Sequence, residues 1–532
     1  MKKGCTIKAL LFFLSFFTLL FFSACAEKEL PPATLPQQQI SITQTKDLYK
    51  ALNLSSNALE DNSYFYPLSE PRDAFASRIF LIDNAKKSID VQYYIYEEDI
   101  SGAFFSYHLL KAANRGVKVR ILIDDLDTSG KDKAWLLLAT HPNITIKVFN
   151  PIHFRKFFRF ITLALHIDSL GRRMHNKALI VDNSFAIIGG RNIGNTYYAT
   201  GDDTLFLDFD VLSAGKVNKD IEKMFTTYWQ SSIVEDASNV LEAKFTKNEL
   251  IESRIFLDKS VSEFAKTSIA KAMLQSSFLE KIKKGKITFI KANAAFFYDL
   301  PEKITTDIED NTYHISREIE REFKHITKSI LIISPYFIPT QDILQKFQTL
   351  RNRGVSITII TNSLASTDVF IVYSAYQKYI KQLLSMGVKI YELKPNSFQR
   401  FKRSKKWIKQ NRVSLHTKLM ILDEQYLTIG SANLDPRSIK LNTETFMIID
   451  STKMAQQLLN EAKQFIKSDD LIEISWGEVL VPYSLSGIKS YGIIYTTTED
   501  GVKKVYYNPP YSSFLRTVGT NFLSYLPIDG YL

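Results

Sequence analysis

The body of this chain lacks cysteine. The sequence has 532 residues and two cysteines, Cys5 and Cys25, both within the first 25 positions. Disulfide bonds and cysteine metal ligands are therefore excluded from the rest of the chain, and folding must depend on an apolar core. With 45% hydrophobic and 13% aromatic residues, the chain can bury a large core and form more than one domain. Disordered and fibrous proteins are excluded.

Acidic residues are outnumbered by basic ones. Lysine and arginine total 67 against 56 acids, which gives a net charge of +11 and a pI near 9.1. Such a balance favours a partner with negative charge, which is either a phospholipid surface or a nucleic acid. Charge alone does not choose between these two.

The first residues have the pattern of an export signal. Residues 1–24 place lysines before an aromatic and leucine-rich run that carries no charge until Glu27, which predicts a signal peptide. The stretch 22–25 is similar to a lipoprotein processing site, so we expect Cys25 to be lipidated and residues 25–60 to form a tether. An uncleaved membrane anchor is the alternative, because the uncharged run 9–26 is 18 residues long, near the minimum span. Both alternatives place the chain in the bacterial cell envelope, facing the periplasm.

Two stretches of the chain follow one plan. Five residues recur at offsets of 0, 2, 7, 14 and 17 in each stretch: His175, Lys177, Asp182, Gly189 and Asn192, then His416, Lys418, Asp423, Gly430 and Asn433. Two unrelated hairpins would not share five offsets. The repeat predicts one active site divided between two halves.

Each stretch has the pattern of a β-hairpin. Alternate side chains of a strand share a face, so the histidine and the lysine two residues later point the same way. The apolar runs 178–181 and 419–422 continue that strand into a core. Asp182 and Asp423 then supply turn chemistry, and a second apolar strand returns to a glycine where the backbone approaches another group closely.

The duplication covers whole domains. Helices and apolar strands alternate from Arg78 onward, and the same order recurs in the second half, with Ser88 and Ser329 separated by 241 residues, as are the two histidines. This predicts two α/β units with mixed sheets covered by helices, at 61–235 and 301–470. We expect a helical connector at 236–300. Residues 471–532 should form a hairpin around Asp500-Gly501 and an apolar tail that packs on the domain or touches a membrane, with packing preferred.

The repeated motif resembles that of a known family. HxKxxxxD followed by glycine and asparagine is the signature of the phospholipase D superfamily. The chain is similar to its two-copy branch, the bacterial cardiolipin synthases of the C type, over most of residues 75–532. Four stretches carry this resemblance: RMHNKALIVDNSFAIIGGRNIG, SIDVQYYIY, RGVKVRILIDD and SFLRTVGTNFLSYLP. It implies two tandem phospholipase D-like α/β sandwich domains with one active site at their pseudo-twofold interface.

Phosphodiester chemistry needs a nucleophile, a proton donor and fixed positive charge. The resemblance implies that one histidine attacks phosphorus to form a phosphohistidine while the other protonates the departing alcohol. We expect His175 to be the nucleophile and His416 the acid. Lys177 and Lys418 would hold the phosphoryl oxygens, and Asn192 and Asn433 would donate hydrogen bonds. Asp182 and Asp423 complete the two catalytic motifs, but we expect them to serve the hairpin turns.

Other residues should support the phosphate and the imidazoles. An imidazole needs a carboxylate on its far nitrogen to fix its tautomer. Glu444, 28 residues after His416, matches the acidic partner of the family; in the first half Asp208 matches, with Asp210 as its rival. The remaining support positions are the two motif glycines and the residue after each of them: Gly189, Gly190, Gly430 and Ser431.

No metal or cofactor is expected. Asp124, Asp125 and Asp127 follow a strand and could ligate Mg²⁺, but such residues are also common caps, which we prefer because the resemblance implies metal independence. Six further histidines show no ligand spacing and should be structural or exposed: His108, His141, His153, His166, His314 and His325.

Two loops that precede the hairpins mix basic and aromatic residues. Segment 154–173 and segment 397–412, which has seven basic residues and no acid, suit a lipid interface. Solvated basic faces and nucleic-acid binding are the alternatives.

We expect a membrane-associated phosphatidyltransferase that makes cardiolipin from phosphatidylglycerol and a second phospholipid, with phosphatidylethanolamine as one candidate. Phospholipase D hydrolysis to phosphatidic acid is the near alternative, and an exported nuclease is the more distant one.

Overall fold

The computed structural model describes residues 47–153, 155, 167–201, 204–397, 412–479 and 490–525. The expected signal peptide, Cys25 and the first part of the tether lie outside the described residues, as do most of the two basic loops and the last seven positions. Within the described ranges, no helix is long and apolar enough to cross a bilayer.

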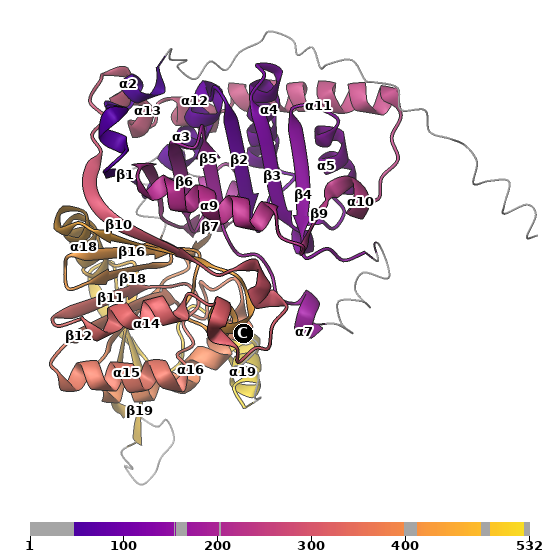
Figure 1. The fold of residues 1–532 in the computed structure, drawn as a ribbon. Coiled ribbons are helices and arrows are strands. Elements are labelled where there is room, and N and C mark those ends of the chain that lie inside the picture. The colour runs from indigo at the N-terminus through magenta and orange to yellow at the C-terminus, as the bar shows by residue number, and fades with distance from the viewer. Residues whose placement is uncertain are drawn as a thin grey trace, which may run out of the picture. The chain divides into compact units, whose positions relative to one another are not determined.

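The first half is built on a mixed sheet (Figure 1). Strands β2, β3 and β4 run parallel, β5 pairs antiparallel with β2, and β6, β8 and β1 continue the sheet in antiparallel fashion. The strands are β1 (Ser63–Leu68), β2 (Ser88–Tyr93), β3 (Lys118–Asp124), β4 (Ile144–Phe149), β5 (Ala178–Val181), β6 (Phe185–Gly189), β7 (Thr204–Leu207), β8 (Asp210–Gly215) and β9 (Val234–Asp236). Every residue of β5 and β6 is buried, as expected for strands covered on both faces.

The second half repeats this pairing. Strands β11, β12 and β13 are parallel, β15 pairs antiparallel with β11, and β16 and β17 follow. Strands β18, β19 and β20 extend the sheet beyond β13, and β19 and β20 form the hairpin predicted around Asp500-Gly501. The strands are β11 (Ser329–Ile333), β12 (Ser356–Asn362), β13 (Lys389–Leu393), β14 (Arg412–Leu415), β15 (Leu419–Leu422), β16 (Tyr426–Gly430), β17 (Thr445–Asp450), β18 (Leu471–Val479), β19 (Ser490–Glu499) and β20 (Val502–Tyr506).

Strand β10 (Ile290–Tyr298) joins the two sheets into one of 18 strands, whereas β7 and β14 pair with each other in a separate, parallel two-stranded sheet. Its first three residues pair with β1, and residues 293–298 pair with β17. The helical connector predicted at 236–300 is thereby corrected, because helices end at Lys283 and a strand follows. β-Branched and aromatic residues dominate the sequence around β10, and these favour a strand.

Helices cover both faces of the sheet. In the first half α3, α4, α11, α12 and α13 pack together, whereas α9 contacts β6, β8 and β10. The helices here are α2 (Leu48–Ala51), η1 (Asn57–Leu59), α3 (Pro71–Asn84), α4 (Ile100–Asn114), η2 (Asp125–Thr128), α5 (Asp132–Ala139), α7 (Ile167–Leu170), α8 (Asn195–Tyr198), α9 (Val217–Trp229), α10 (Ala237–Val240), α11 (Lys247–Lys266), α12 (Ser268–Leu274) and α13 (Ser277–Lys283).

In the second half α18 contacts β16, and α19 packs on α16. The helices here are η3 (Pro301–Ile304), η4 (Asn311–Tyr313), α14 (Ser316–Lys324), α15 (Gln341–Asn352), α16 (Phe370–Ser385), the π-helical η5 (Arg437–Leu441), α18 (Thr452–Ile466) and α19 (Phe514–Leu523). Both α4 and α15 end two residues before a glycine with positive φ, Gly116 and Gly354, where the chain turns into the next parallel strand. The two halves therefore repeat in their turns as well as in their strands.

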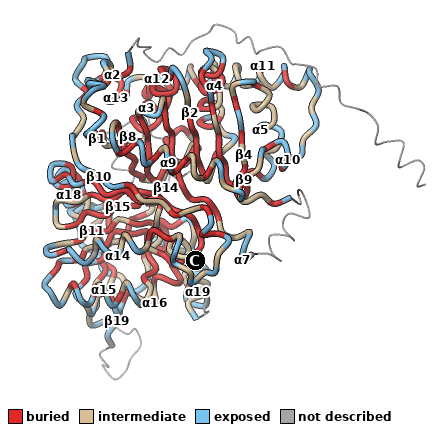
Figure 2. Tube along the Cα trace, in the orientation of Figure 1, coloured by how far each residue is buried: buried red, intermediate tan, exposed pale blue. Residues whose placement is uncertain are grey.

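One apolar core is shared by the halves. It includes Met174 and Phe225 from the first half and Leu415 and Leu458 from the second. Figure 2 shows buried segments running through the region where the strands of both halves meet. The expected fold class, α/β with mixed sheets flanked by helices, is confirmed, and the shared core fixes the two motif hairpins relative to each other.

Candidate active site

The two histidine–lysine pairs lie where the halves meet. Each pair directly precedes the first strand of its hairpin, β5 or β15. The backbone N–H of His175 donates to the carbonyl of Thr443 (2.9 Å), and that of His416 donates to the carbonyl of Leu207 (2.8 Å). Each motif is therefore hydrogen-bonded to the opposite half.

Each histidine also takes its carboxylate from the opposite half. Nδ1 of His175 lies 2.9 Å from Oε2 of Glu444, and Nδ1 of His416 lies 2.7 Å from Oδ2 of Asp208. A carboxylate accepts only, so Nδ1 carries the proton and Nε2 is left with a lone pair. Neither half can orient its own imidazole without the other.

The sheet register shows why Asp208 and not Asp210 fills this role. Gly189 pairs with Asp210 and Gly430 pairs with Phe446, so Asp208 and Glu444 stand at equivalent positions two residues earlier. Asp210 instead forms buried ion pairs with Arg78 (3.0 Å) and Arg191 (3.1 Å). Its charge is neutralised within the first half.

Small residues let the carboxylates approach the hairpins. A Cβ at Gly190 would lie 2.2 Å from Oδ1 of Asp208, and one at Gly189 would lie 2.3 Å from Oδ1 of Asp210. At Gly430 a Cβ would meet the carbonyl of Thr445 at 2.0 Å.

The position equivalent to Gly190 in the second half is Ser431. Its hydroxyl donates to Oε2 of Glu444 (2.5 Å), and the hydroxyl of Ser438 donates to Oε1 (2.9 Å). Glu444 therefore accepts from two hydroxyl groups, whereas its counterpart Asp208 lies beside Gly190, which has no hydroxyl.

Both motif lysines are buried and electrostatically coupled. The ammonium groups of Lys177 and Lys418 each donate to the carbonyl of the histidine two residues earlier, at 2.6 Å. Burial lowers the pKa of Lys177 to about 7, and the neighbouring Lys418 lowers it further while Glu444 opposes the shift. Burial also lowers the pKa of Lys418. A bound phosphate anion would offset these shifts, because it would stabilise both ammonium groups.

The histidines are neutral in the free protein at neutral pH. Burial lowers the pKa of His175 to about 4, although Glu444 opposes the shift. Burial also lowers the pKa of His416 well below its usual range, and Lys418 and Lys177 act in the same direction. A neutral imidazole with Nδ1–H held by a carboxylate presents the Nε2 lone pair that a nucleophile requires.

The two motif asparagines are not equivalent. The side chain of Asn192 accepts from the N–H of Ile95 (3.2 Å) and donates to the hydroxyl of Tyr197 (2.8 Å). In contrast, the Oδ1 atom of Asn433 is buried and has no hydrogen-bond partner among the described residues. Asn192 supports the pocket wall, whereas Asn433 retains an unused acceptor.

The motif aspartates sit at the hairpin turns. The carboxylate of Asp182 accepts from the backbone N–H groups of 86–88, and that of Asp423 accepts from those of 327–329. These contacts tie each hairpin to the start of the neighbouring parallel strand, which supports the structural role expected for both residues.

Two residues at strand ends hold the backbone that leads into the histidines, and the sequence analysis did not assign this role to either of them. Asp124, at the end of β3, accepts from Nε of Arg173 and from the N–H of Met174, both at 2.8 Å. Asn362, at the end of β12, accepts from the N–H of Leu415 at 2.8 Å. The signal was present, because Asp124 and Asn362 are separated by 238 residues, like Gly116 and Gly354.

Aromatic rings enclose the imidazoles. The ring of Tyr94 lies 5.2 Å from that of His175, and the rings of Tyr197 and Phe206 lie 5.3 Å and 5.1 Å from that of His416. Such walls restrict imidazole rotation and exclude water, which strengthens electrostatic interactions in the site. Sequence reasoning missed these three residues because nothing in their spacing marks them.

The aspartates considered as Mg²⁺ ligands are occupied by protein groups. Asp124 caps η2 through the N–H of Leu126, Asp125 pairs with Arg155 (2.7 Å), and Asp127 pairs with Lys131 (2.9 Å). Across the described residues, no group of three or more acidic, histidine or cysteine side chains has the arrangement of a metal site.

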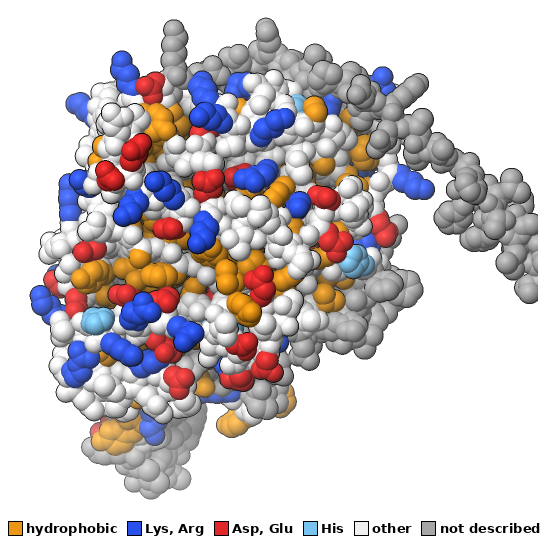
Figure 3. Space-filling model, viewed as in Figure 1, with side chains coloured by type: hydrophobic (Ala, Val, Ile, Leu, Met, Phe, Trp, Pro, Cys, Tyr) orange, Lys and Arg blue, Asp and Glu red, His pale blue; other side chains and the backbone are white. Residues whose placement is uncertain are grey.

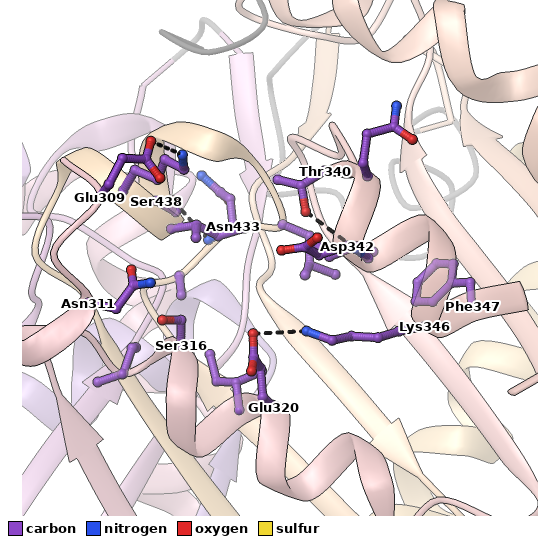
Figure 4. A pocket seen from close by; sticks show the side chains of 18 residues that line it. Glu309, Asn311, Ser316, Glu320, Thr340, Asp342, Lys346, Phe347, Asn433 and Ser438 are labelled. Carbon is purple, nitrogen blue, oxygen red and sulfur yellow. Dashed lines mark hydrogen bonds and ion pairs between the residues drawn. The ribbon is translucent and has the colours of Figure 1, made fainter. Parts of the chain in front are cut away.

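A cavity of about 310 Å³ borders the site in the second half (Figure 4). It lies between α14, α15 and the segment from Asn433 to η5, and an ion pair between Glu320 and Lys346 (2.9 Å) crosses it. Neither motif histidine lines the cavity. Its lining includes the motif residue Asn433, and Ser438, whose hydroxyl donates to Glu444.

Comparisons with known proteins agree with this geometry. The family model described as "Cardiolipin synthase, PLD-like domain" matches residues 79–229 and 319–466. The chain is 38% identical to cardiolipin synthase C of Escherichia coli K12, over 76% of this chain and 84% of that protein. It is 34% identical to an uncharacterized protein of Helicobacter pylori J99, over 97% and 99%.

A solved structure supports the fold. The phosphatidylserine synthase of Haemophilus influenzae Rd KW20 matches with a TM-score of 0.51 and 16% identity, over 78% of this chain and 90% of that chain. At this identity the match establishes the architecture alone. Taken with the family model, which covers both motif hairpins, the chain belongs to the cardiolipin synthase family of phospholipase D-like enzymes.

Proposed function

We propose that this enzyme makes cardiolipin by transferring a phosphatidyl group from phosphatidylglycerol to a hydroxyl of a second phospholipid. The observation that carries the proposal is the pair of imidazoles, each held at Nδ1 by a carboxylate from the other half, beside two buried lysines. This arrangement offers two Nε2 atoms, and a double displacement at phosphorus needs two such groups.

In the first step Nε2 of His175 attacks phosphorus, the bond from phosphorus to the headgroup glycerol oxygen breaks, and the phosphatidyl group stays on His175. His416, protonated at Nε2, gives its proton to the departing alkoxide. The phosphodiester brings the negative charge that favours this protonation, and the nearby Asp368 raises the pKa of His416 against the effect of burial. Lys177 and Lys418 stabilise the charge that develops on the phosphoryl oxygens.

In the second step the acceptor hydroxyl attacks the phosphohistidine. Nε2 of His416 now takes the hydroxyl proton, the bond from phosphorus to His175 breaks, and the enzyme returns to its starting state. If water takes the place of the lipid hydroxyl, the product is phosphatidic acid and the enzyme acts as a phospholipase D. Because the same residues serve both reactions, the choice depends on which acceptor reaches the phosphohistidine.

We also propose that Cys25 is lipidated after removal of residues 1–24 and that the protein faces the periplasm. The support is the sequence pattern of the leader, together with the phospholipid chemistry of the family. Mass spectrometry of the mature N-terminus tests this proposal. A diacylglyceryl group on Cys25 is expected, and an intact Met1 would show that the leader is an uncleaved anchor.

Lipid mass spectrometry tests the reaction. The full chain is incubated with phosphatidylglycerol vesicles, with and without phosphatidylethanolamine, beside a His416→Ala control. Cardiolipin formed only by the active chain is the expected result, and its dependence on phosphatidylethanolamine would identify the acceptor. Phosphatidic acid without cardiolipin would make the chain a phospholipase D. If neither lipid forms, cleavage of DNA or RNA becomes the activity to test.

A further inference from the structure

Helix α19 exposes an apolar face. The three most exposed large apolar side chains among the described residues belong to this helix and to the turn that follows it: Tyr525 (88%), Leu515 (81%) and Phe514 (79%). Phe522 and Val518 lie on the same face, because positions 514, 515, 518, 522 and 525 follow helical spacing. Figure 3 shows apolar side chains at the lower edge of the molecule, where α19 lies in Figure 1. The helix packs on α16, as expected for this tail, but this face of it stays exposed.

The opposite face of α19 is firmly anchored. Thr520 is fully buried, and its carbonyl accepts from Nε2 of Gln377 on α16 (3.2 Å). Nη2 of Arg516 donates to the carbonyl of Thr367 (2.8 Å). The exposed apolar side chains are thus held in place on a fixed helix.

The anchor point adjoins the active site. Directly after Thr367, Asp368 accepts from the hydroxyl of Tyr336 (2.7 Å), and its charge acts on His416. Helix α19 is consequently anchored to the segment that leads to the residues around His416.

The stretches of sequence that contain these anchoring residues are rich in basic residues. No acidic residue occurs between Asp500 and Asp529, and segment 397–412 carries seven basic residues and no acid. The described end of that segment, Arg412, donates to the same Thr367 carbonyl that holds Arg516 (2.6 Å). An exposed apolar face in a stretch without acidic residues, anchored beside Arg412 and Arg516, matches a bilayer with anionic headgroups better than it matches a basic or neutral protein surface.

We propose that the α19 face formed by Phe514, Leu515, Val518, Phe522 and Tyr525 docks on an anionic phospholipid bilayer and presents the His416 side of the active site to the lipid headgroups. The inference deepens the proposed function, on whose phospholipid substrates it rests. Docking would let a lipid enter the site while its acyl chains stay in the membrane.

Fluorescence quenching tests the docking. The full chain, labelled with an environment-sensitive dye at Phe522→Cys, is reconstituted in phosphatidylglycerol vesicles that carry brominated acyl chains. The matched control is Phe256→Cys on α11, whose side chain is equally exposed, at 70% against 67%. The native chain treated identically gives the background from Cys5 and Cys25. Strong quenching at 522 with little at 256 is expected, and equal quenching at both positions would overturn the proposal.

A second variant separates docking from catalysis. Phe514→Ser/Leu515→Ser/Phe522→Ser should lower turnover of vesicle phosphatidylglycerol at least tenfold relative to turnover of a short-chain, monomeric phosphatidylglycerol. An unchanged ratio would overturn docking. So would a disulfide that links position 522 of two copies of the unlabelled Phe522→Cys chain, because it would show that a second chain covers the face. The quenching needs no turnover, so quenching at 522 in a chain that transforms no lipid would support docking and reject the proposed function.

Discussion

Replacing Glu444 by glutamine tests the cross-half support of His175. Glutamine has nearly the same shape as glutamate, but an NH2 group, which donates and does not accept, replaces one of the two carboxylate oxygens. The carboxylate accepts from Nδ1 of His175 (2.9 Å) and from the hydroxyls of Ser431 (2.5 Å) and Ser438 (2.9 Å). Glu444→Gln therefore removes the negative charge that stabilises the imidazolium character of His175 during attack on phosphorus.

The size of the effect follows from the bond that is lost. A hydrogen bond to a charged group contributes about 1.5 to 3 kcal/mol. At about 1.4 kcal/mol for each tenfold change in rate, we expect kcat/KM for phosphatidylglycerol to fall roughly 10- to 150-fold. Steady-state turnover of the full chain measures this, with thermal unfolding as the check that the variant is folded.

Glu392→Gln is the matched control. Glu392 is also fully buried in the second half, but its partner is the hydroxyl of Tyr373 (3.2 Å) and not a histidine. Burial raises the pKa of Glu392 to about 8, so this carboxyl is largely protonated at neutral pH and glutamine replaces it with little electrostatic change. Turnover should stay within about twofold of the native value. Native turnover in Glu444→Gln, or an equal loss in Glu392→Gln, would refute the reasoning.

Three further changes have definite expected outcomes. Gly190→Ala would place a Cβ 2.2 Å from Oδ1 of Asp208 and should lower turnover roughly tenfold. The control Gly519→Ala, which has open space around the new Cβ, should keep the native turnover. Equal turnover in the two variants would contradict this prediction. Because the pKa of Lys177 is lowered to about 7, its ammonium group loses its proton as the pH rises. We therefore expect kcat/KM to fall above about pH 7. A pH profile of kcat/KM that stays flat to about pH 9 would contradict this prediction. Asp423→Ala removes the acceptor of three backbone N–H groups and should cost about 1 to 3 kcal/mol of stability, seen as a lower urea midpoint; an unchanged midpoint would rule out the structural role.

The repeated spacing in the sequence was enough to predict the hairpins. The repeated offsets predicted a hairpin with its turn at Asp182, although His175 and Lys177 directly precede the strand on which they were expected, and the alternation of helices and strands predicted a mixed sheet covered by helices in each half. These features are local, because strand periodicity and turn chemistry are written in neighbouring residues.

Contacts between the halves could not be predicted in the same way. Asp208 and Glu444 were identified as imidazole partners, but their exchange between halves depends on how the shared core packs. Strand β10 was assigned to a helical connector, because its pairing with β1 and β17 is set by tertiary structure. The rings of Tyr94 and Phe206 reach the histidines from distant positions in the chain, and no spacing marks them.

Identification of the covalent intermediate tests the central claim most directly. The full chain is mixed with phosphatidylglycerol, quenched at alkaline pH, where phosphohistidine survives, and digested for peptide mass spectrometry. We expect a phosphatidyl group on the peptide that contains His175, and none in His175→Ala. A phosphatidyl group on His416 would reverse the two roles, and cardiolipin formation without an adduct on either histidine would contradict the double-displacement mechanism.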